Sequence, residues 1–213
     1  MSSDVLVTTP AQRQTEPHAE AVSRNRRQQA TFRKVLAAAM ATLREKSYAD
    51  LTVRLVAGRA KGAPATAYTY FSSKNHLIAE VYLDLVRQVP CVTDVNVPMP
   101  IRVTSSLRHL ALVVADEPEI GAACTAALLD GGADPAVRAV RDRIGAEIHR
   151  RITSAIGPGA DPGTVFALEM AFFGALVQAG SGTFTYHEIA DRLGYVVGLI
   201  LAGANEPSTG GSE

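Results

Sequence analysis

The sequence is poor in cysteine and has no long apolar run. Its two cysteines, Cys91 and Cys124, fit no metal-ligand or redox spacing, so we interpret them as buried thiols in a protein without a disulfide framework. No stretch of roughly 18 consecutive apolar residues occurs, so the sequence predicts no membrane-spanning helix. The amino-terminal residues also lack the basic start and apolar segment of a secretory signal. These absences predict a cytoplasmic protein.

Sequence signatures of enzymes are missing as well. The five histidines form no HExxH or Cys/His metal-ligand pattern, and no Gly-x-Ser-x-Gly motif occurs. His149 lies two residues from Glu147, but side chains at that spacing on a helix point apart. The glycine-containing segment 154–163 lacks the preceding strand of a phosphate-binding loop. The sequence therefore predicts no enzyme, no cofactor and no metal site.

The chain has a net charge of zero, but its charges are unevenly distributed. From Arg24 to Arg87, 12 Lys and Arg stand against 4 Asp and Glu. From Cys91 to Glu213, 8 basic residues stand against 14 acidic ones. A small basic unit thus precedes a larger acidic one. This asymmetry is typical of a protein in which one part binds a polyanion such as nucleic acid.

Apolar residues recur with the period of α-helices, and no alternating strand pattern occurs. The clearest helix has apolar positions three and four residues apart, at Phe32, Val35, Leu36, Ala39, Met40 and Leu43. Later segments repeat this period up to residue 204. The sequence therefore predicts an all-α protein with about nine helices.

Capping residues mark where the other helices begin. Thr52 precedes the short run VRLVAGRA, and Pro64 is suited to the first position of a helix that ends near Tyr70. Ser72 or Ser73 then caps a helix that runs to about position 89. An acidic residue directly before a proline predicts three further helix starts, at Glu117, Asp134 and Asp161.

A long helix, a short helix, a glycine-containing turn and a second short helix describe a helix-turn-helix. The stretch 66–77, TAYTYFSSKNHL, crowds aromatic residues that can fix the second short helix, while hydroxyls and a lysine remain for DNA. With its surroundings, residues 27–82, it resembles the TetR (tetracycline repressor) family through the pattern TxYxYFxSKxxL. The turn departs from the family signature: its glycine is displaced by one position to Gly62, and alanines replace the usual serine and second glycine.

The resemblance implies the DNA contacts. Tyr70 and Phe71 would pack inward, and the partner would be a palindromic double-stranded DNA operator. For Tyr68 the alternative role is packing in the core. For the arginines the alternative is that they are solvated surface charges without a DNA contact. The residues that would contact phosphates or bases are Arg26, Arg27, Thr52, Arg54, Thr66, Tyr68, Thr69 and Lys74.

In this family the carboxy-terminal helices form a ligand chamber and a dimer interface. The last two predicted helices, 162–182 and 186–204, mix bulky residues with glycines, so we expect them to form the homodimer interface. The segment 127–152 is also similar to the matching region of actinobacterial regulators of sterol and lipid catabolism. Few charges occur among the candidate chamber residues, which favours a hydrophobic small-molecule effector. These candidates are Tyr82, Val86, Leu107, Leu110, Ala111, Val114, Cys124, Leu128, Ile144, Ile148, Phe166, Met170 and Phe173.

The predicted organisation is a disordered arm at 1–23, a helix-turn-helix DNA-binding domain at 24–72, a ligand-binding and dimerisation domain at 73–203, and a disordered tail at 204–213. The predicted function is a ligand-responsive transcriptional regulator, and most relatives of this kind are repressors that their effector releases from DNA. Two alternatives stay open. One is a helical interaction protein that has lost DNA binding, which the altered turn favours. The other is a DNA-binding regulator whose core is filled.

Overall fold

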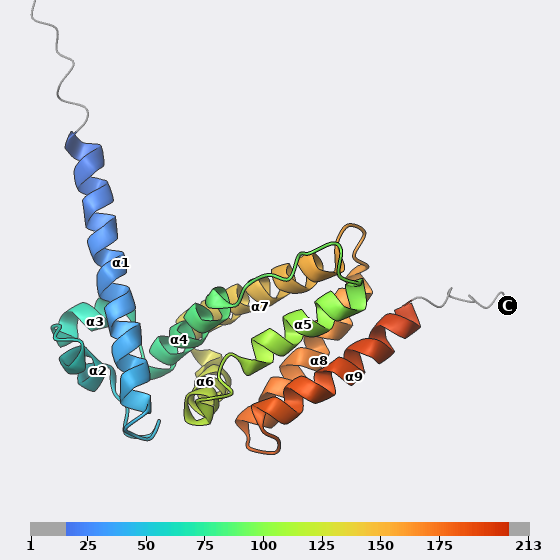
Figure 1. Cartoon of the computed structure of the whole chain (residues 1–213). Coiled ribbons are helices and arrows are strands. Elements are labelled where there is room, and N and C mark those ends of the chain that lie inside the picture. Colours follow the sequence, from blue (N-terminus) through green and yellow to red (C-terminus); the bar gives the residue numbers. More distant parts are fainter. Residues whose placement is uncertain (1–15, 205–213) are drawn as a thin grey trace, which may run out of the picture.

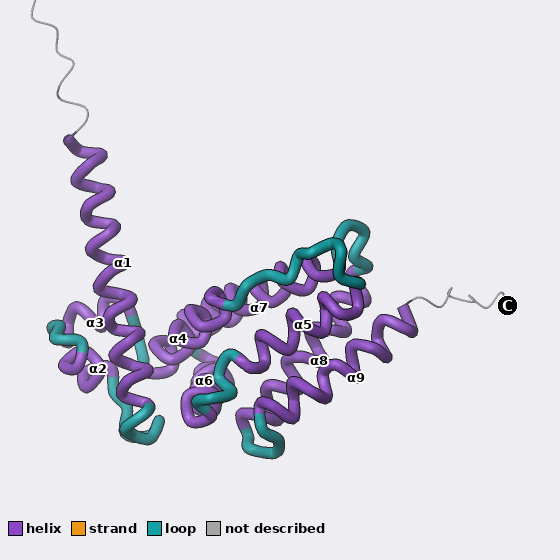
Figure 2. Tube along the Cα trace, in the orientation of Figure 1, coloured by secondary structure: helices purple, strands orange, loops and turns teal. Residues whose placement is uncertain are grey.

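The computed structural model describes residues 16–204, and within them every regular element is a helix (Figure 1, and by element type Figure 2). The predicted all-α class with about nine helices is confirmed for this part of the chain. The elements are α1 Glu16–Leu43, α2 Val53–Arg59, α3 Pro64–Tyr70, α4 Lys74–Gln88, α5 Met99–Leu112, α6 Pro118–Asp130, the 3-10 helix η1 Gly131–Ala133, α7 Pro135–Ile156, α8 Pro162–Gly180 and α9 Tyr186–Ala204.

Helix α1 begins earlier than the sequence pattern indicated. It starts at Glu16, so the predicted disordered arm 1–23 is wrong for residues 16–23, which are helical. The segment 16–31 has few apolar residues but is rich in Ala, Glu, Gln and Arg, which have high helix propensities. Figure 1 shows this part of α1 extending away from the other helices. The rest of the predicted arm, and residues 205–213 of the predicted tail, lie outside the described residues.

Helices α1, α2 and α3 form a small unit at one end of the molecule, and α4 joins it to a bundle of α5 to α9 (Figure 1). Helix α4 packs against α1 on one side and against α6 and α7 on the other. Within the bundle, α5 packs along α9 and α7, and α8 packs against α9 and α6. The buried core is continuous from Leu36 in α1 through Leu77 in α4 to Ile148 in α7. A displacement of α4 would therefore be felt by both parts.

Side-chain caps begin four helices where the sequence predicted them. Thr52 caps α2, Ser73 rather than Ser72 caps α4, Asp134 caps α7 and Asp161 caps α8. Each side-chain oxygen accepts a hydrogen bond from a backbone N–H two or three residues further on, which would otherwise have no partner in the helix. Short polar residues at these positions thus fix the helix boundaries locally.

Glu117 occupies the predicted N-cap position of α6, with Pro118 as the first helical residue, but its side chain makes no capping hydrogen bond. Its carboxylate accepts two hydrogen bonds from the guanidinium of Arg44, one of them 2.6 Å long. The ion pair joins the turn after α1 to the start of α6. A long acidic side chain with an arginine in reach makes this charge-assisted contact instead of folding back onto its own helix.

Helices α8 and α9 carry exposed apolar side chains. By length and composition, α8 is the one helix in the described part of the chain that could cross a membrane. Only 28% of its most apolar 18-residue stretch is buried in the protein. Its buried side chains face the bundle, while its exposed ones recur at spacings of three and four and so share one side. We call the exposed set the α8–α9 stripe; it consists of Phe166, Met170, Phe173 and Val177 of α8 with Tyr195 and Leu199 of α9.

Candidate nucleic-acid interface and ligand cavity

The turn between α2 and α3 is regular despite its altered sequence. The N–H of Gly62 donates to the carbonyl of Ala57 at 2.9 Å, and the N–H of Lys61 donates to that of Gly58 at 3.0 Å. This pair of bonds is the Schellman arrangement that ends many helices. The residue that takes the left-handed conformation is Lys61, with φ 54°. The glycine displaced to position 62 is therefore one residue too late to relieve this strain.

Replacing Lys61 with glycine is expected to stabilise the protein by about 1 kcal/mol, because a left-handed backbone costs a side-chain-bearing residue about that much. Thermal unfolding should show a melting temperature higher by roughly 3 °C. Gly62→Ala is the matched control: an added Cβ would lie 3.8 Å from the carbonyl oxygen of Ala57, an ordinary contact, so little change is expected. A Lys61→Gly protein that melts earlier than the original would contradict this description of the turn.

Helix α3 is held to the molecule by an aromatic cluster. Phe71, the residue after α3, is completely buried and stacks on Phe32 of α1 with ring centroids 5.1 Å apart. Tyr70 meets Phe32 edge-on at 6.1 Å. Ala67, one turn earlier, is also buried. A helix of only seven residues cannot be stable alone, so this packing fixes its position.

The outer side of α2 and α3 carries most of the predicted DNA contacts. Arg54 of α2 and Thr66 of α3 are exposed, and so are Arg26 and Arg27 of α1. Tyr68 is 52% exposed, so its ring does not pack in the core. The arginines have the charge that phosphate contacts require, Thr66 and Tyr68 have hydroxyls that can bond to phosphates or base edges, and all of them are accessible.

The two remaining threonines have part of their hydrogen-bonding capacity in use. Thr52 accepts the bond that caps α2 and keeps its hydroxyl hydrogen for a phosphate. Thr69 donates to the carbonyl of Thr66 at 2.6 Å, so its oxygen remains to accept a bond from a base. Each can thus offer DNA one complementary interaction.

Lys74, at the start of α4, is more constrained than the sequence suggested. Its ammonium donates to the backbone carbonyl of Tyr48 at 3.0 Å and lies 4.3 Å from the centroid of the Tyr48 ring. The Tyr48 hydroxyl in turn donates to Asn75. An ammonium has three donors, and the contact with the turn after α1 uses one of them. The remaining donors can still bond to a phosphate, so that contact stays a prediction.

A cavity of about 460 Å³ lies between α4, α6, α7, α8 and the start of α9. Five of the predicted chamber residues line it, at Tyr82, Cys124, Leu128, Ile144 and Phe173. This volume lies within the range of small-molecule sites. The structure thus does not support the alternative of a completely filled core.

The other predicted chamber residues lie elsewhere. Six are buried in the packed core, namely Val86, Leu107, Leu110, Ala111, Val114 and Ile148. Phe166 and Met170 are exposed on α8, because the helix turns them away from the bundle. Helical periodicity separates the inner from the outer side of a helix, but it does not separate core from cavity wall. The sequence reasoning missed eight lining residues: Gly121, Thr125, Leu129, Gly132, Arg141, Leu176, Val177 and Tyr186.

The cavity wall combines apolar side chains with a few polar ones. Among the described residues the hydroxyl of Tyr82 has no hydrogen-bond partner, although Tyr82 is only 4% exposed. Tyr186 stands close to α6, since a Cβ on Gly121 would lie 2.4 Å from the Tyr186 hydroxyl. Burial raises the pKa of the Cys124 thiol to about 12, so it stays protonated and is not a reactive thiolate.

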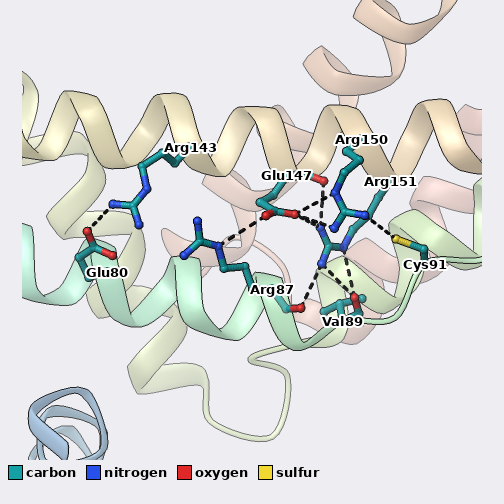
Figure 3. A network of polar contacts seen from close by, with 8 residues as sticks. All are labelled: Glu80, Arg87, Val89, Cys91, Arg143, Glu147, Arg150 and Arg151. Atoms are coloured by element: carbon teal, nitrogen blue, oxygen red, sulfur yellow. Dashed lines mark hydrogen bonds and ion pairs between the residues drawn. The ribbon is translucent and has the colours of Figure 1, made fainter. Parts of the chain in front are cut away.

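A polar network joins the far end of α4 to α7 (Figure 3). Arg151 of α7 is 1% exposed, and its guanidinium donates to the carbonyl of Val89 at 3.0 Å and to that of Arg87 at 3.3 Å. These carbonyls belong to the last turn of α4 and to its C-cap residue, and would otherwise lack helical partners. Glu147 balances the charge, accepting bonds from Arg151 at 2.6 Å and from Arg150 at 2.8 Å.

Two further contacts join the front half of α4 to α7. The buried carboxylate of Glu80 accepts from Arg143 at 2.6 Å, as Figure 3 also shows. Ser73, which caps α4, donates to Asp134, which caps α7, at 2.9 Å. Helix α4 is therefore fastened to α7 at its start, its middle and its end.

The stability of the protein is expected to fall in acid through Glu147. Hydrogen bonds from Arg150 and then Arg151 lower the pKa of its carboxyl from 4.5 to about 2. Because the folded pKa is the lower one, the stabilisation is present above about pH 4.5 and is lost as the pH falls toward 2. Between pH 5 and pH 3 this group should lower the free energy of unfolding by about 2 kcal/mol. Urea unfolding at both pH values measures the loss, and Glu147→Gln, which cannot titrate, should show a correspondingly smaller one.

Comparisons with known proteins agree with this geometry. Residues 35–81 match the family described as bacterial regulatory proteins, tetR family. HTH-type transcriptional regulators of Mycobacterium tuberculosis and Mycobacterium bovis are 99% identical to the chain over 213 residues, the whole length of both partners in each comparison. The chain is also similar to a solved TetR transcriptional regulator from Rhodococcus sp., with a TM-score of 0.69, 20% identity, and coverage of 85% of this chain and 99% of that one. FadR of Thermus thermophilus, a TetR-family repressor solved with lauroyl-CoA, gives a TM-score of 0.60 at 17% identity, with the same coverage of 85% and 99%.

Proposed function

The chain belongs to the TetR family of bacterial transcriptional regulators, and from this premise we propose that it is a homodimeric repressor whose grip on a palindromic operator is released by a hydrophobic small molecule. The observation that carries the proposal is that an exposed α2–α3 face occurs together with a separate cavity. Tyr82 of α4, the helix that joins the two parts of the molecule, lines this cavity. An organised face for DNA and a separate cavity for an effector are the two sites that a ligand-responsive regulator needs.

In the proposed complex, α3 enters the major groove. Its exposed Thr66, Tyr68 and Thr69 face the bases and the adjoining phosphates. Thr52 and Arg54 at the start of α2 contact the backbone on one side, and Arg26, Arg27 and Lys74 offer further phosphate contacts. The phosphate contacts supply affinity and the base contacts supply sequence preference.

The dimer forms through α8 and α9. Six large apolar side chains of the α8–α9 stripe are between 37% and 72% exposed in the single chain, and two of them, Phe173 and Val177, also line the rim of the ligand cavity. A groove of about 850 Å³ runs between the two helices and would receive side chains of a second copy. A contiguous apolar patch of this kind marks an interface. Two-fold symmetry then presents two α3 helices to half-sites about 34 Å apart, or a multiple of this distance.

Effector binding acts on the spacing of the two α3 helices. Tyr82 of α4 and Ile144 of α7 both line the cavity, and the polar network fastens the two helices together. A ligand that fits better when α4 is displaced favours a dimer with the wrong spacing, and the operator affinity falls by that differential affinity. The mostly apolar lining of the cavity suits a hydrophobic effector. Lauroyl-CoA, with which the FadR structure was solved, also has an apolar chain.

Footprinting on the DNA upstream of the protein's own gene tests this function. We expect protection of two short half-sites related by a dyad, and loss of protection for Thr66→Ala combined with Tyr68→Ala. Circular dichroism of the double variant should match the original, because both residues are exposed. Protection of one half-site would contradict the dimeric mode, and uniform protection without a dyad would contradict operator recognition.

The alternative of a helical interaction protein that has lost DNA binding rested on the altered turn. That turn retains the hydrogen bonds of a regular helix end, so the observation that favoured the alternative no longer does so.

A further inference from the structure

The cavity contains two polar groups that an apolar effector would leave unused. The hydroxyl of Tyr82 is buried and has no hydrogen-bond partner within residues 16–204. Arg141 also lines the cavity. An unpaired buried hydroxyl costs free energy, and a ligand oxygen within reach would recover it. These two groups, together with the shape of the cavity, restrict what the protein can bind.

Arg141 is charged and has no acidic partner among the described side chains. The other arginines of α7 that take part in ion pairs, Arg143, Arg150 and Arg151, contact Glu80 or Glu147, whereas no carboxylate lies within 4.0 Å of Arg141. Its guanidinium instead donates to the carbonyl of Leu128, near the end of α6. A guanidinium has five donors in a planar fork, so most of its capacity remains free for a carboxylate or phosphate.

The two groups occupy different depths. Tyr82 comes from α4 and is almost completely buried. Arg141 is half-buried, and its guanidinium lies near Gly132, where an added Cβ would be 3.6 Å away. Leu129, which also lines the cavity, is 59% exposed, so this side is open to solvent. The deep end thus offers a phenolic hydroxyl and the mouth offers a positive charge.

The size of the cavity limits the part of a ligand that it encloses. At about 30 Å³ for each water-sized group, 460 Å³ holds about 15 non-hydrogen atoms. Between the polar ends the wall is built from Leu128, Ile144, Phe173 and Leu176. An unbranched chain of about ten carbons, or a ring system of similar size, fills such a space.

We propose that the effector is an anionic amphiphile: its apolar body fills the cavity, its negatively charged head binds Arg141 at the mouth, and a second oxygen at the buried end bonds to Tyr82. This proposal rests on the proposed function, because it defines the ligand of the same site. A free carboxylate and the phosphates of an acyl-coenzyme A thioester share the required charge. The hydroxyl of Tyr82 can donate to a carbonyl or accept from an alcohol.

Isothermal titration with matched ten-carbon probes separates the two recognition points. Decanoate is expected to bind the dimeric protein at least 10-fold more tightly than decanol, since a charge-assisted pair is worth that much. In Arg141→Met, which keeps an unbranched side chain without charge, this preference should fall to about twofold or less. Decanol binding that survives in Arg141→Met shows that the cavity is still formed.

The buried end is tested with 10-hydroxydecanoate. It should bind several-fold more tightly than decanoate to the original protein and equally tightly to Tyr82→Phe, which removes only the hydroxyl. Decanoyl-coenzyme A forms the last arm: binding tighter than that of decanoate, lost in Arg141→Met, would identify a thioester as the source of the anion. Decanol that binds as tightly as decanoate, a preference that persists in Arg141→Met, or no binding of any probe would overturn the proposal.

Operator binding in the absence of ligand keeps this outcome distinct from that of the proposed function. If the protein protects its operator but shows no preference for anions, the proposed repressor function stands and only the proposed effector class is rejected. If the protein binds decanoate through Arg141 but protects no DNA, the proposed repressor function is rejected and the proposed binding site stands.

Discussion

Arg151→Ala is expected to lower the free energy of unfolding by about 4 kcal/mol, the largest effect of a single substitution that we predict. Arg151 is 1% exposed and makes three kinds of contact at once: with Glu147, with the carbonyl of Val89 and with that of Arg87. Alanine leaves a large cavity and two carbonyls at the end of α4 without partners. Chemical unfolding followed by circular dichroism measures the change.

Arg150→Ala is the matched control for this experiment. Arg150 binds the same carboxylate of Glu147, but its side chain is 55% exposed, so its loss should cost less than 1 kcal/mol. Comparing the two substitutions therefore separates the effect of burying the guanidinium from the effect of its charge. Equal effects of the two substitutions would show that the contacts of Arg151 with the end of α4 contribute nothing to stability.

Tyr195→Asp is expected to turn the dimer into a monomer and to reduce operator affinity by 100-fold or more. Tyr195 is 72% exposed on α9 and belongs to the α8–α9 stripe, where a dimer would cover it. An aspartate there would be buried without a partner in the interface, which costs several kcal/mol. A monomer presents one α3 helix and loses the gain from binding two half-sites together.

Val95→Asp serves as the control for the dimer. Val95 is 84% exposed in the segment between α4 and α5, away from the stripe, so the same change of charge should leave the molar mass and the operator affinity unaltered. Light scattering during gel filtration measures the mass. A Tyr195→Asp protein that remains dimeric and binds the operator normally would place the interface elsewhere.

Local chemistry made much of the DNA-binding unit predictable. Thr52 and Ser73 set helix boundaries through hydrogen bonds within three residues, Pro64 does so through its fixed φ at the first helical position, and the structure has these boundaries where they were predicted. The role of Phe71 followed in the same way from the family pattern, and the ring is completely buried. Short-range interactions of this kind are written in short segments of sequence.

The cavity was much less predictable, because it depends on how helices far apart in the chain come together. Leu107 and Leu128 have the same character and the same helical spacing, yet one lies in the core and the other in the cavity wall. Arg141 and Arg151 are two of several arginines on the same helix and no local motif distinguishes them, yet one lines the cavity and the other is buried. Only the packing of α4 to α8 in the folded protein separates these cases.

The turn after α2 lies between these two situations. The sequence showed that its glycine was displaced, and it could not show the consequence. The structure keeps the hydrogen bonds of the turn and places the left-handed conformation on Lys61. The fold thus retains the backbone of the helix-turn-helix and accepts a strained residue to do so.

The salt dependence of operator binding, measured by fluorescence anisotropy for the original protein and for Arg54→Ala, tests the central claim most directly. We predict that the logarithm of affinity falls linearly with the logarithm of salt concentration, and that the slope is smaller by about 0.9 for each phosphate contact the variant loses. Arg54 is exposed at the start of α2, so the fold should survive the change. Binding that does not depend on salt, or an identical slope for Arg54→Ala, would contradict a DNA-binding face built on α2 and α3.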